Sequence, residues 1–305
     1  MLREGKYKEG LKNYECRLSA SDYPLDLKLY KNMPRSLDEI KNKKVLAVAE
    51  QGLGDVLQFV RYLKLLKKYA SEIYLQCNKK LFRILSSIGC INKFYDLDDK
   101  IENYDFYIPL MSLPYLFKTN LKNIPNFYYI KPEENLVNEW KNKLKEKKGF
   151  KIGLFWQGNI KSSGSSARAI KLKDLEILLD FKNVDFISLQ KGYGHEQIKE
   201  SKFSKYMIDN NDNIDTGTDA FIDTAAIIKN LDLIISSDTS IVHLSGAIGT
   251  KVWMLEPKIP NWTWTNYGTT TSWYSSLEIF RQEKADDWKK PVKDLKNKLS
   301  EILKR

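Results

Sequence analysis

The chain has 305 residues, which is too long for one ordinary hydrophobic core and enough for two domains. A hydrophobic fraction of 42% and a charged fraction of 29% are those of a globular protein and exclude a disordered chain. The apolar runs are too short to cross a bilayer and there is no charged-then-apolar leader, so we expect a cytoplasmic protein.

The net charge and the counts of cysteine and histidine limit the ligands and partners that the chain could bind. Fifty Lys plus Arg against 39 Asp plus Glu gives a net charge of +11, which could serve nucleic acid, an anionic membrane face or phosphorylated ligands. Because the lysines are spread through many segments, we expect a solvated surface and no nucleic-acid partner, with peripheral contact at the inner membrane face left open. Three cysteines without paired spacing and only two histidines argue against a metal centre, so no metal and no cofactor are expected.

The first 35 residues are expected to be a helical segment. Tyr7, Leu11 and Tyr14 fall on one face of a helix over residues 5–17, and prolines interrupt the chain after it.

From residue 36 to 133 the pattern changes to strands that alternate with helices. Residues 45–49 form a continuous apolar run of the kind seen in buried parallel strands. Apolar residues at helical spacing follow this run. The other elements expected here are strands at 72–76, 93–97 and 105–108 and a helix at 80–88.

A second series of strands and helices is expected over 151–285, after a lysine-rich linker helix at 134–150. A last amphipathic helix occupies 286–305. Alternating strands and helices are typical of doubly wound parallel sheets, so the predicted fold class is α/β, with two Rossmann-like domains facing a ligand-binding cleft. The second series comprises strands at 151–155, 184–189, 205–208, 231–236 and 252–255 and helices at 171–181, 219–230 and 239–249.

The segment 231–243 ends a buried strand and starts a helix within a few residues. Asp238, Thr239 and Ser240 are types that cap helices, and the free N–H groups and dipole of a helix start favour a diphosphate. His243 lies one turn inside this helix. Simple capping, with His243 bonded to a neighbouring carbonyl, fits the spacing equally well, so spacing alone leaves both interpretations open.

A glycine turn, Gly52-Leu53-Gly54-Asp55, follows the first strand of the N-terminal series. The glycines permit a tight turn and close approach of a substrate, but the turn lacks the third glycine of the dinucleotide fingerprint. Asp55 is either a helix cap or a general base that deprotonates an acceptor hydroxyl.

A Ser/Gly-rich loop, 161–167, follows the strand at 151–155 and ends at Arg168. An arginine at the end of such a loop suits a closing clamp on a phosphate. The alternative is a surface loop with an incidental arginine. The only candidate for a metal-binding carboxylate motif, residues 96–99, is expected to close a strand. A leaving diphosphate would therefore be stabilised without a metal cation, by the helix dipole, hydroxyl groups and Arg168.

Residues 257–274 are rich in aromatic side chains that could stack on a base or a sugar ring. Aromatic residues crowded near a chain crossover are more often core, and we favour that interpretation for Trp253 and Trp273. The cluster holds Trp262, Trp264, Tyr267, Trp273 and Tyr274.

Several stretches carry a resemblance that runs in order from about residue 40 to the end of the chain. They are VLAVAEQGLGDVLQFVRYL (45–63), YIPLMSLPYLF (107–117), KIGLFWQGN (151–159), FISLQKG (186–192), DTAAIIKNLDLIISSDTSIVHLSGAIGTKVWML (223–255) and SWYSSLEIFRQ (272–282). Together they resemble the heptosyltransferase-like glycosyltransferases of family 9, which have the GT-B architecture of two Rossmann-like domains. Within that family they resemble the branch fused behind tetratricopeptide repeats, and residues up to Arg17 resemble the end of one repeat unit, which cannot form a solenoid alone.

The resemblance implies roles for individual residues. Asp55 matches the general base. Arg168 matches a basic residue on the donor diphosphate, where Asp238, Thr239 and His243 match the D-T-x-x-x-H segment. Further residues expected on the donor side are Ser240, Gln157 and Asn159, with Gln190 and Lys191 beside the nucleoside. The residues expected on the acceptor side are Gln51, Gly52, Gly54 and Ser112.

The implied activity is an inverting, metal-independent transfer of a sugar from a nucleoside-diphosphate sugar to a glycan, lipid-linked or protein hydroxyl. Cell-surface glycan or lipopolysaccharide synthesis is the expected setting. Three alternatives stay open: a non-catalytic nucleotide- or sugar-binding or assembly module that kept the fold, a nucleic-acid binder that rests on charge alone, and a sugar-nucleotide epimerase of the same architecture. The sequence does not identify the donor base, the sugar or the acceptor.

Overall fold

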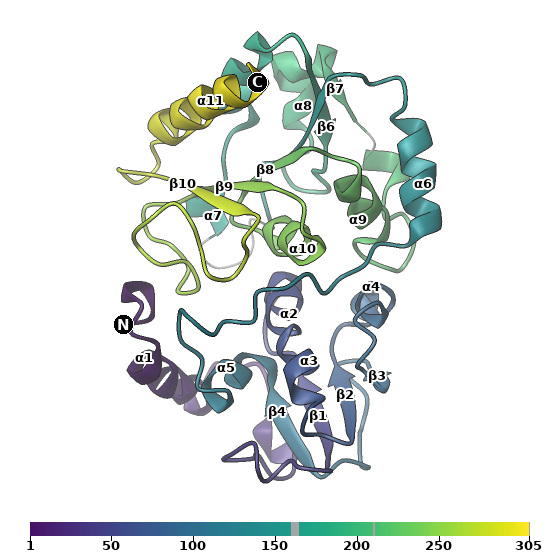
Figure 1. Cartoon of the computed structure of the whole chain (residues 1–305), viewed down its shortest axis with the longest axis vertical. Helices are drawn as coiled ribbons and strands as arrows, with labels where there is room; N and C mark the ends of the chain where they lie inside the picture. The colour runs from purple at the N-terminus through teal and green to yellow at the C-terminus, as the bar shows by residue number, and fades with distance from the viewer. Residues whose placement is uncertain (160–164, 210, 305) are drawn as a thin grey trace.

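Two parallel sheets organise the chain into two α/β units (Figure 1). The computed structural model describes residues 1–159, 165–209 and 211–304. In Figure 1 the N-terminal unit lies below the C-terminal unit, and helices flank each sheet. This arrangement confirms the α/β fold class expected from the alternation of strands and helices.

The N-terminal sheet is built around β1 (Lys44–Val48), whose last four residues are buried as the apolar run predicted. β1 pairs in parallel with β2 on one side and β4 on the other, which gives the order β3-β2-β1-β4. The other strands are β2 (Glu72–Gln76), β3 (Lys93–Tyr95) and β4 (Phe106–Pro109).

The C-terminal sheet has the order β10-β9-β8-β5-β6-β7, and its pairings are parallel. Successive strands run to one side of β5 and then, from β8 onward, to the other. In open α/β sheets the crevice outside the carboxyl ends at such a switch point binds ligands. The strands are β5 (Phe150–Phe155), β6 (Val184–Ser188), β7 (Met207–Ile208), β8 (Leu233–Ser237), β9 (Val252–Glu256) and β10 (Leu277–Arg281).

Several elements differ from the predictions, among them β7, which is two residues shorter than expected, and three differences have a clear physical reason. β10 was not predicted, because it is a short edge strand whose buried residues are interrupted by partly exposed ones. The helix expected at 171–181 is a 3-10 helix, Leu172–Asp180, whose buried leucines recur every third residue and so match the tighter helical period. The linker helix α6 (Glu134–Lys143) ends early, because residues 145–148 are exposed and bury no face.

Two helices meet at the boundary between the units. α10 (Ser240–Ile248) is buried from Ile241 onward, and Gly249 ends it with a φ of 92°, a conformation that favours glycine. α2 (Leu53–Phe59) packs against it from the N-terminal unit (Figure 1). The remaining helices are α1 (Tyr7–Tyr14), α3 (Tyr62–Leu66), α4 (Phe82–Ser86), α5 (Leu113–Leu116), α7 (Ser165–Arg168), α8 (Gln197–Glu200), α9 (Ile222–Lys229) and α11 (Lys289–Leu303).

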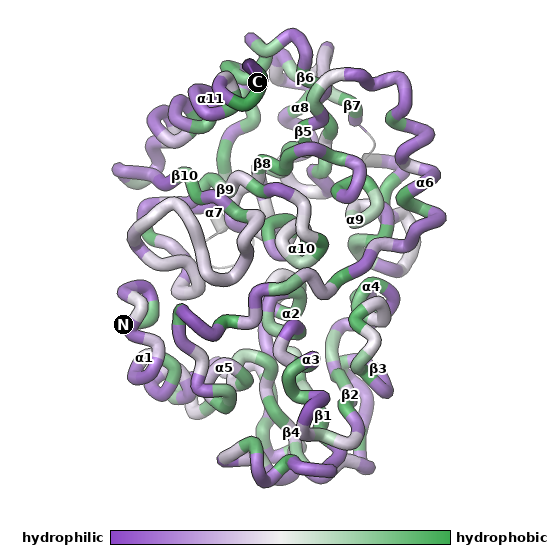
Figure 2. Tube along the Cα trace, viewed as in Figure 1, coloured by the Kyte–Doolittle hydropathy of each residue, from purple (hydrophilic) through white to green (hydrophobic). Residues whose placement is uncertain are grey.

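The apolar core continues from one unit into the other. A single cluster of buried side chains includes Ala47 of β1, Leu57 of α2 and Val242 of α10. Figure 2 shows hydrophobic segments along the strands and mostly hydrophilic ones along α6 at the periphery. Because the shared interface is apolar, packing holds the two units together. Across the described ranges, no helix combines the length and the apolar character needed to span a membrane.

A fully buried arginine also joins the units. Arg61, between α2 and α3, has no exposed surface. Its guanidinium donates hydrogen bonds to four oxygen acceptors. These are the carbonyls of Gln58, Pro125 and Trp273 and the hydroxyl of Tyr129. Since Pro125 and Trp273 lie far apart in the sequence, one desolvated cation fixes segments of both units against each other.

The N-terminal segment contacts both units. Tyr7 and Leu11 of α1 are each 2% exposed, which confirms the helical face predicted for this segment. The Trp273 indole N–H donates to the Tyr7 hydroxyl at 3.2 Å, and the Asn266 amide donates to the Arg3 carbonyl at 2.9 Å. Descent of this segment from a tetratricopeptide unit stays a prediction.

Candidate active site

The first turns of α2 and α10 face each other at the boundary between the units. A Cβ atom on Gly54 would lie 3.3 Å from both His243 Cδ2 and Ser240 Cα, so a larger residue here would force its neighbours to shift. α2 follows β1 and α10 follows β8, each at the switch point of its sheet. The glycine turn and the segment around Asp238, which are far apart in the sequence, therefore meet.

A cleft of about 320 Å³ opens beside this contact. Leu53 and Lys80 line it from the N-terminal unit, and Phe155, Lys191 and Ser240 line it from the C-terminal unit. Its volume lies at the lower end of the range for small-molecule sites. Both units thus contribute to one cleft at the predicted donor side.

Asp55 is the third residue of α2 and is half-buried. Burial, and then the charge of Asp238, raise the pKa of the Asp55 carboxyl to about 6, although the Gly52 and Asp55 amides and Arg168 oppose the shift. A carboxyl group with this pKa is mostly ionised at pH 7 and still accepts a proton readily. Asp55 from one unit therefore shares its electrostatic environment with Asp238 and Arg168 from the other.

Asp238 and Arg168 form a charged pair on the donor side. Asp238 is 3% exposed, and Arg168 Nη1 lies 3.8 Å from its Oδ2 and donates to its main-chain carbonyl at 3.3 Å. Burial raises the pKa of Asp238, and Arg168 acts against that shift. The Arg168 side chain remains 31% exposed and can still reach a ligand. Most of the loop predicted to close over this site falls at 160–164, outside the described residues.

The start of α10 distinguishes between the two interpretations that spacing left open. Thr239 is the N-cap residue, and its side chain makes no capping hydrogen bond to the first turn. The Thr239 hydroxyl instead lies 3.1 Å from the Ser236 hydroxyl. The Val242 amide donates back to the Thr239 carbonyl at 3.1 Å. Because the Thr239 side chain does not cap the earlier amides of Ser240 and Ile241, these can serve an anion, which favours anion binding over simple capping.

His243 is buried beneath this turn and is uncharged. Its ring stacks on Trp264 with centroids 5.5 Å apart, and its Nδ1 lies 3.1 Å from the Tyr274 hydroxyl, not against a carbonyl. Burial, and then the positive charges of Arg61 and Arg168, lower its pKa to about 3. His243 therefore cannot hold a diphosphate as a cation at pH 7, and a hydrogen bond from the neutral ring is the contact left to it.

Gln190 holds backbone segments of the donor side together through hydrogen bonds. Its side chain is fully buried, and Oε1 accepts hydrogen bonds from the amides of Trp156 and Gln157 at 3.0 and 3.1 Å. Its Nε2 donates to the carbonyls of Gln157 and Tyr193. These bonds tie the carboxyl end of β5 to the turn after β6, so Gln190 acts on backbone in this structure and its contact with a nucleoside stays a prediction.

The other predicted donor-side residues lie around the same edge. The Lys191 ammonium donates to the carbonyls of Ile214 and Asp215. The Gln157 side chain accepts from Gln197 at 2.9 Å, and Asn159 is exposed just beyond β5. Direct contact of each with a donor remains a prediction.

The residues predicted for the acceptor side divide into two groups. Gln51 and Gly52 are exposed in the turn before Asp55. Ser112 is only 2% exposed, and its hydroxyl donates to Glu15 at 2.7 Å and accepts from Arg17 at 2.8 Å. Ser112 is thus part of a buried polar network, and its contact with an acceptor stays a prediction.

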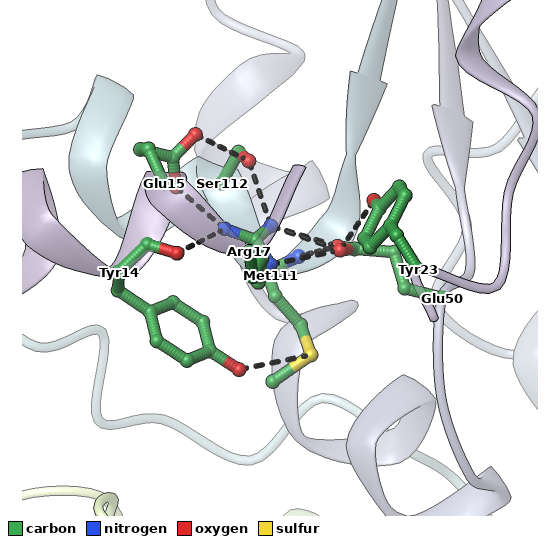
Figure 3. Close-up of polar contacts among 7 residues, drawn as sticks. All are labelled: Tyr14, Glu15, Arg17, Tyr23, Glu50, Met111 and Ser112. Atoms are coloured by element: carbon green, nitrogen blue, oxygen red, sulfur yellow. Dashed lines mark hydrogen bonds and ion pairs between the residues drawn. The ribbon is translucent and has the colours of Figure 1, made fainter. Parts of the chain in front are cut away.

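Glu50 lies at the centre of that network, which Figure 3 shows. The Glu50 carboxylate lies 2.9 Å from Arg17 Nη2 and accepts from the Tyr23 hydroxyl at 2.7 Å and the Met111 amide at 2.9 Å. The N-terminal segment is thereby fastened to the start of the turn that carries Asp55. Sequence reasoning missed Glu50, because its partner Arg17 is 33 residues away.

A second cleft, of about 660 Å³, lies between α1 and the segment after β9. Tyr14 and Trp262 line it, with ring centroids 5.1 Å apart, and Trp262 also stacks on Phe59 at 5.8 Å. Phe59 lies one helical turn after Asp55 on α2, so this aromatic wall is close to Asp55. Trp253 and Trp273, by contrast, are buried in the core as predicted.

Glu256, at the end of β9, is a second buried carboxyl group that sequence reasoning missed. Burial raises its pKa to about 8, with Arg281 opposing and Asp238 adding to the shift. Arg281 contacts the Glu256 carboxyl group directly, so the pair adds little net negative charge beside Asp238. Among the described residues, no cluster of three or more His, Cys, Asp or Glu side chains could hold a metal ion.

The fold and the position of the cleft define a GT-B-type glycosyltransferase architecture. The structure is similar to glycosyl transferase family 9 from Veillonella parvula DSM 2008, with a TM-score of 0.62 and 12% identity over 87% of this chain and 98% of that one. It is similar to the ADP-heptose lipopolysaccharide heptosyltransferase II of E. coli, with a TM-score of 0.58 and 11% identity over 85% and 98%. It is also similar to E. coli heptosyltransferase WaaC with ADP-2-deoxy-2-fluoro heptose, with a TM-score of 0.53 and 11% identity. This match covers 86% of this chain and 99% of that one. At these identities the likeness establishes the fold.

Among curated proteins, the chain is 25% identical to Protein FlbA of Caulobacter vibrioides over 311 residues. The match covers 94% of this chain and 51% of FlbA, so the chain spans about half the length of the curated relative it matches. No family model matches the chain.

Proposed function

We propose that this chain is a glycosyltransferase that moves a sugar from a nucleoside-diphosphate sugar to a hydroxyl acceptor. The observation that carries the proposal is the meeting of Asp55 with Arg168 and the first turn of α10 across the boundary between the units. A structural neighbour that contains an ADP-sugar analogue supports a nucleotide-sugar donor. We extend the proposal to a glycan, lipid-linked or protein acceptor in cell-surface glycan or lipopolysaccharide synthesis at the inner membrane face.

The chemistry is a single displacement. The acceptor hydroxyl oxygen forms a bond to the anomeric carbon while its proton passes to the Asp55 carboxylate. The bond from that carbon to the diphosphate oxygen breaks, and the diphosphate leaves with the electron pair. Arg168 and the first-turn amides of α10 stabilise its charge in place of a metal ion. Because the acceptor attacks opposite to the leaving group, the configuration of the sugar inverts.

Asp55→Asn is the variant that tests this proposal, since it keeps the shape of the side chain and removes the base. We expect transfer to fall by about 10²–10⁴-fold, while calorimetry shows unchanged binding of nucleoside diphosphates. Asp38→Asn, at an exposed aspartate that does not line the cleft, serves as the matched control. A wild-type chain that binds nucleoside diphosphates but transfers no sugar would favour the non-catalytic binding module, and donor conversion without an acceptor would favour an epimerase.

A further inference from the structure

Phe221 adopts an unusual backbone conformation at the edge of the 320 Å³ cleft. It is the N-cap residue of α9, with a φ of 67° and a ψ of 12°, in the left-handed region. Bulky side chains rarely occupy this region, because the Cβ atom approaches the following carbonyl oxygen too closely. Such conformations persist where the surroundings hold them, and they are frequent at ligand sites.

The segment before α9 is held from three directions. Lys191, beyond the end of β6, donates to the carbonyls of Ile214 and Asp215. The Asp215 carboxylate accepts from the Asp223 amide at 2.8 Å inside α9. The Ala220 amide donates at 2.8 Å to the Lys80 carbonyl of the N-terminal unit. These bonds fix the backbone on both sides of Phe221 and maintain its strained conformation.

The cleft that Phe221 lines suits a flat heterocycle. Phe155, Leu189 and Ile241 give it apolar walls, and its polar groups come from Lys80, Lys191, Asp215, Asp219, Thr218 and Thr224. Apolar and aromatic walls with a few polar groups are typical of small-molecule sites, and the face of an aromatic ring stacks on a nucleobase. Ser240, in the first turn of α10, lines the same cleft. A diphosphate at that turn would therefore leave its nucleoside in reach of Phe221.

We propose that Phe221 is the stacking residue for the base of the donor nucleotide and that its surroundings hold it in the left-handed conformation to face the ligand. This inference rests on the proposed function. A phenylalanine that only filled the core would contribute to stability and leave affinity for the base unchanged.

Titration calorimetry with ADP, GDP, UDP, CDP and dTDP, and with pyrophosphate as a probe without a base, tests the inference. Phe221→Ala should weaken binding of the preferred nucleoside diphosphate about tenfold or more, within the range that loss of base stacking gives. It should leave pyrophosphate binding unchanged, and Phe221→Trp should retain affinity. Tyr206→Ala removes a 62% exposed aromatic ring outside the cleft and should change nothing.

Melting temperatures of Phe221→Gly and Phe221→Ala give a second measurement. Both lack the ring, but only glycine adopts a φ of 67° without strain, so Phe221→Gly should melt higher than Phe221→Ala, the reverse of the usual order. Wild-type affinity for the base in Phe221→Ala, or equal loss of nucleotide and pyrophosphate binding, overturns the inference and leaves the proposed function standing. A wild-type chain that binds none of these diphosphates overturns both.

Discussion

The turn between β1 and α2 and the turn between β8 and α10 have the same plan and different chemistry. Each links the carboxyl end of a central parallel strand to a helix at the boundary between the units. Asp55 lies inside its helix and is half-buried, whereas Asp238 precedes its helix and is 3% exposed. One turn thus leaves its carboxylate partly exposed at the boundary between the units, and the other buries its carboxylate just before a helix start. The same local geometry serves a proton acceptor in one unit and an anion site in the other.

The two turns are also held by different means. The first is fastened by the Glu50 network to the N-terminal segment, while the second packs through the almost entirely buried α10. Each turn can therefore be perturbed through its own set of contacts.

The largest effect should come from breaking the first turn's network. Arg17→Met removes the cation from a Glu50 side chain that has no exposed surface. Leaving that charge unpaired should lower the free energy of unfolding by about 3 kcal/mol, measured by urea denaturation. The double variant Arg17→Met, Glu50→Gln should recover part of the loss. A single variant as stable as the wild type would show that the N-terminal segment does not support this turn.

A smaller effect should follow from weakening the binding of the diphosphate at the second turn. Arg168→Ala removes a guanidinium from the leaving group, and kcat/KM should fall about 100-fold, as for loss of one charge-stabilising donor. Arg168→Lys should recover part of the activity. Stability should fall as well, because the buried Asp238 carboxylate loses its cation, so rates are measured well below the melting temperature of the variant. An unchanged kcat/KM would remove Arg168 from the proposed mechanism.

The smallest effect is the pH dependence of the first turn. Because the pKa of Asp55 is about 6, the base is lost as the pH falls through 6, and kcat/KM at pH 5 should be about tenfold below its plateau. A carboxyl group whose pKa is raised by folding stabilises the folded state more at pH 5 than at pH 8, so unfolding through Asp55 does not explain the loss. Rates and melting temperatures measured together from pH 5 to 8 check that activity falls at low pH and that stability does not fall because of Asp55. A rate that does not change with pH contradicts the assignment of Asp55 as the base.

The elements that bury continuous apolar runs were predictable from the sequence, and those that depend on distant partners were not. β1, β2, β5 and β8 follow directly from their hydrophobic pattern. β10 has an interrupted pattern and is defined by its neighbour β9. The site shows the same division, because Asp55, Arg168 and Asp238 follow strand ends, which periodicity locates.

The buried charges of the site were not predictable. Glu50, Arg61 and Glu256 have no local signal, since their environments come from residues that lie far away in the sequence. The strain at Phe221 was equally hidden, because a backbone angle held by Lys191 and Lys80 leaves no pattern around the residue itself.

The contacts of α1 have a consequence for the order in which the chain folds. Tyr7 is bonded to Trp273, 266 residues away, and Arg3 to Asn266. During synthesis the first helix therefore has no complete surface to pack on until the last part of the C-terminal unit has left the ribosome. Contacts of such long sequence separation form late and slowly. Residues 3–14 should therefore be among the last of the described residues to settle, and the cleft between α1 and the segment after β9 should be completed only when Trp262 and Asn266 are in place.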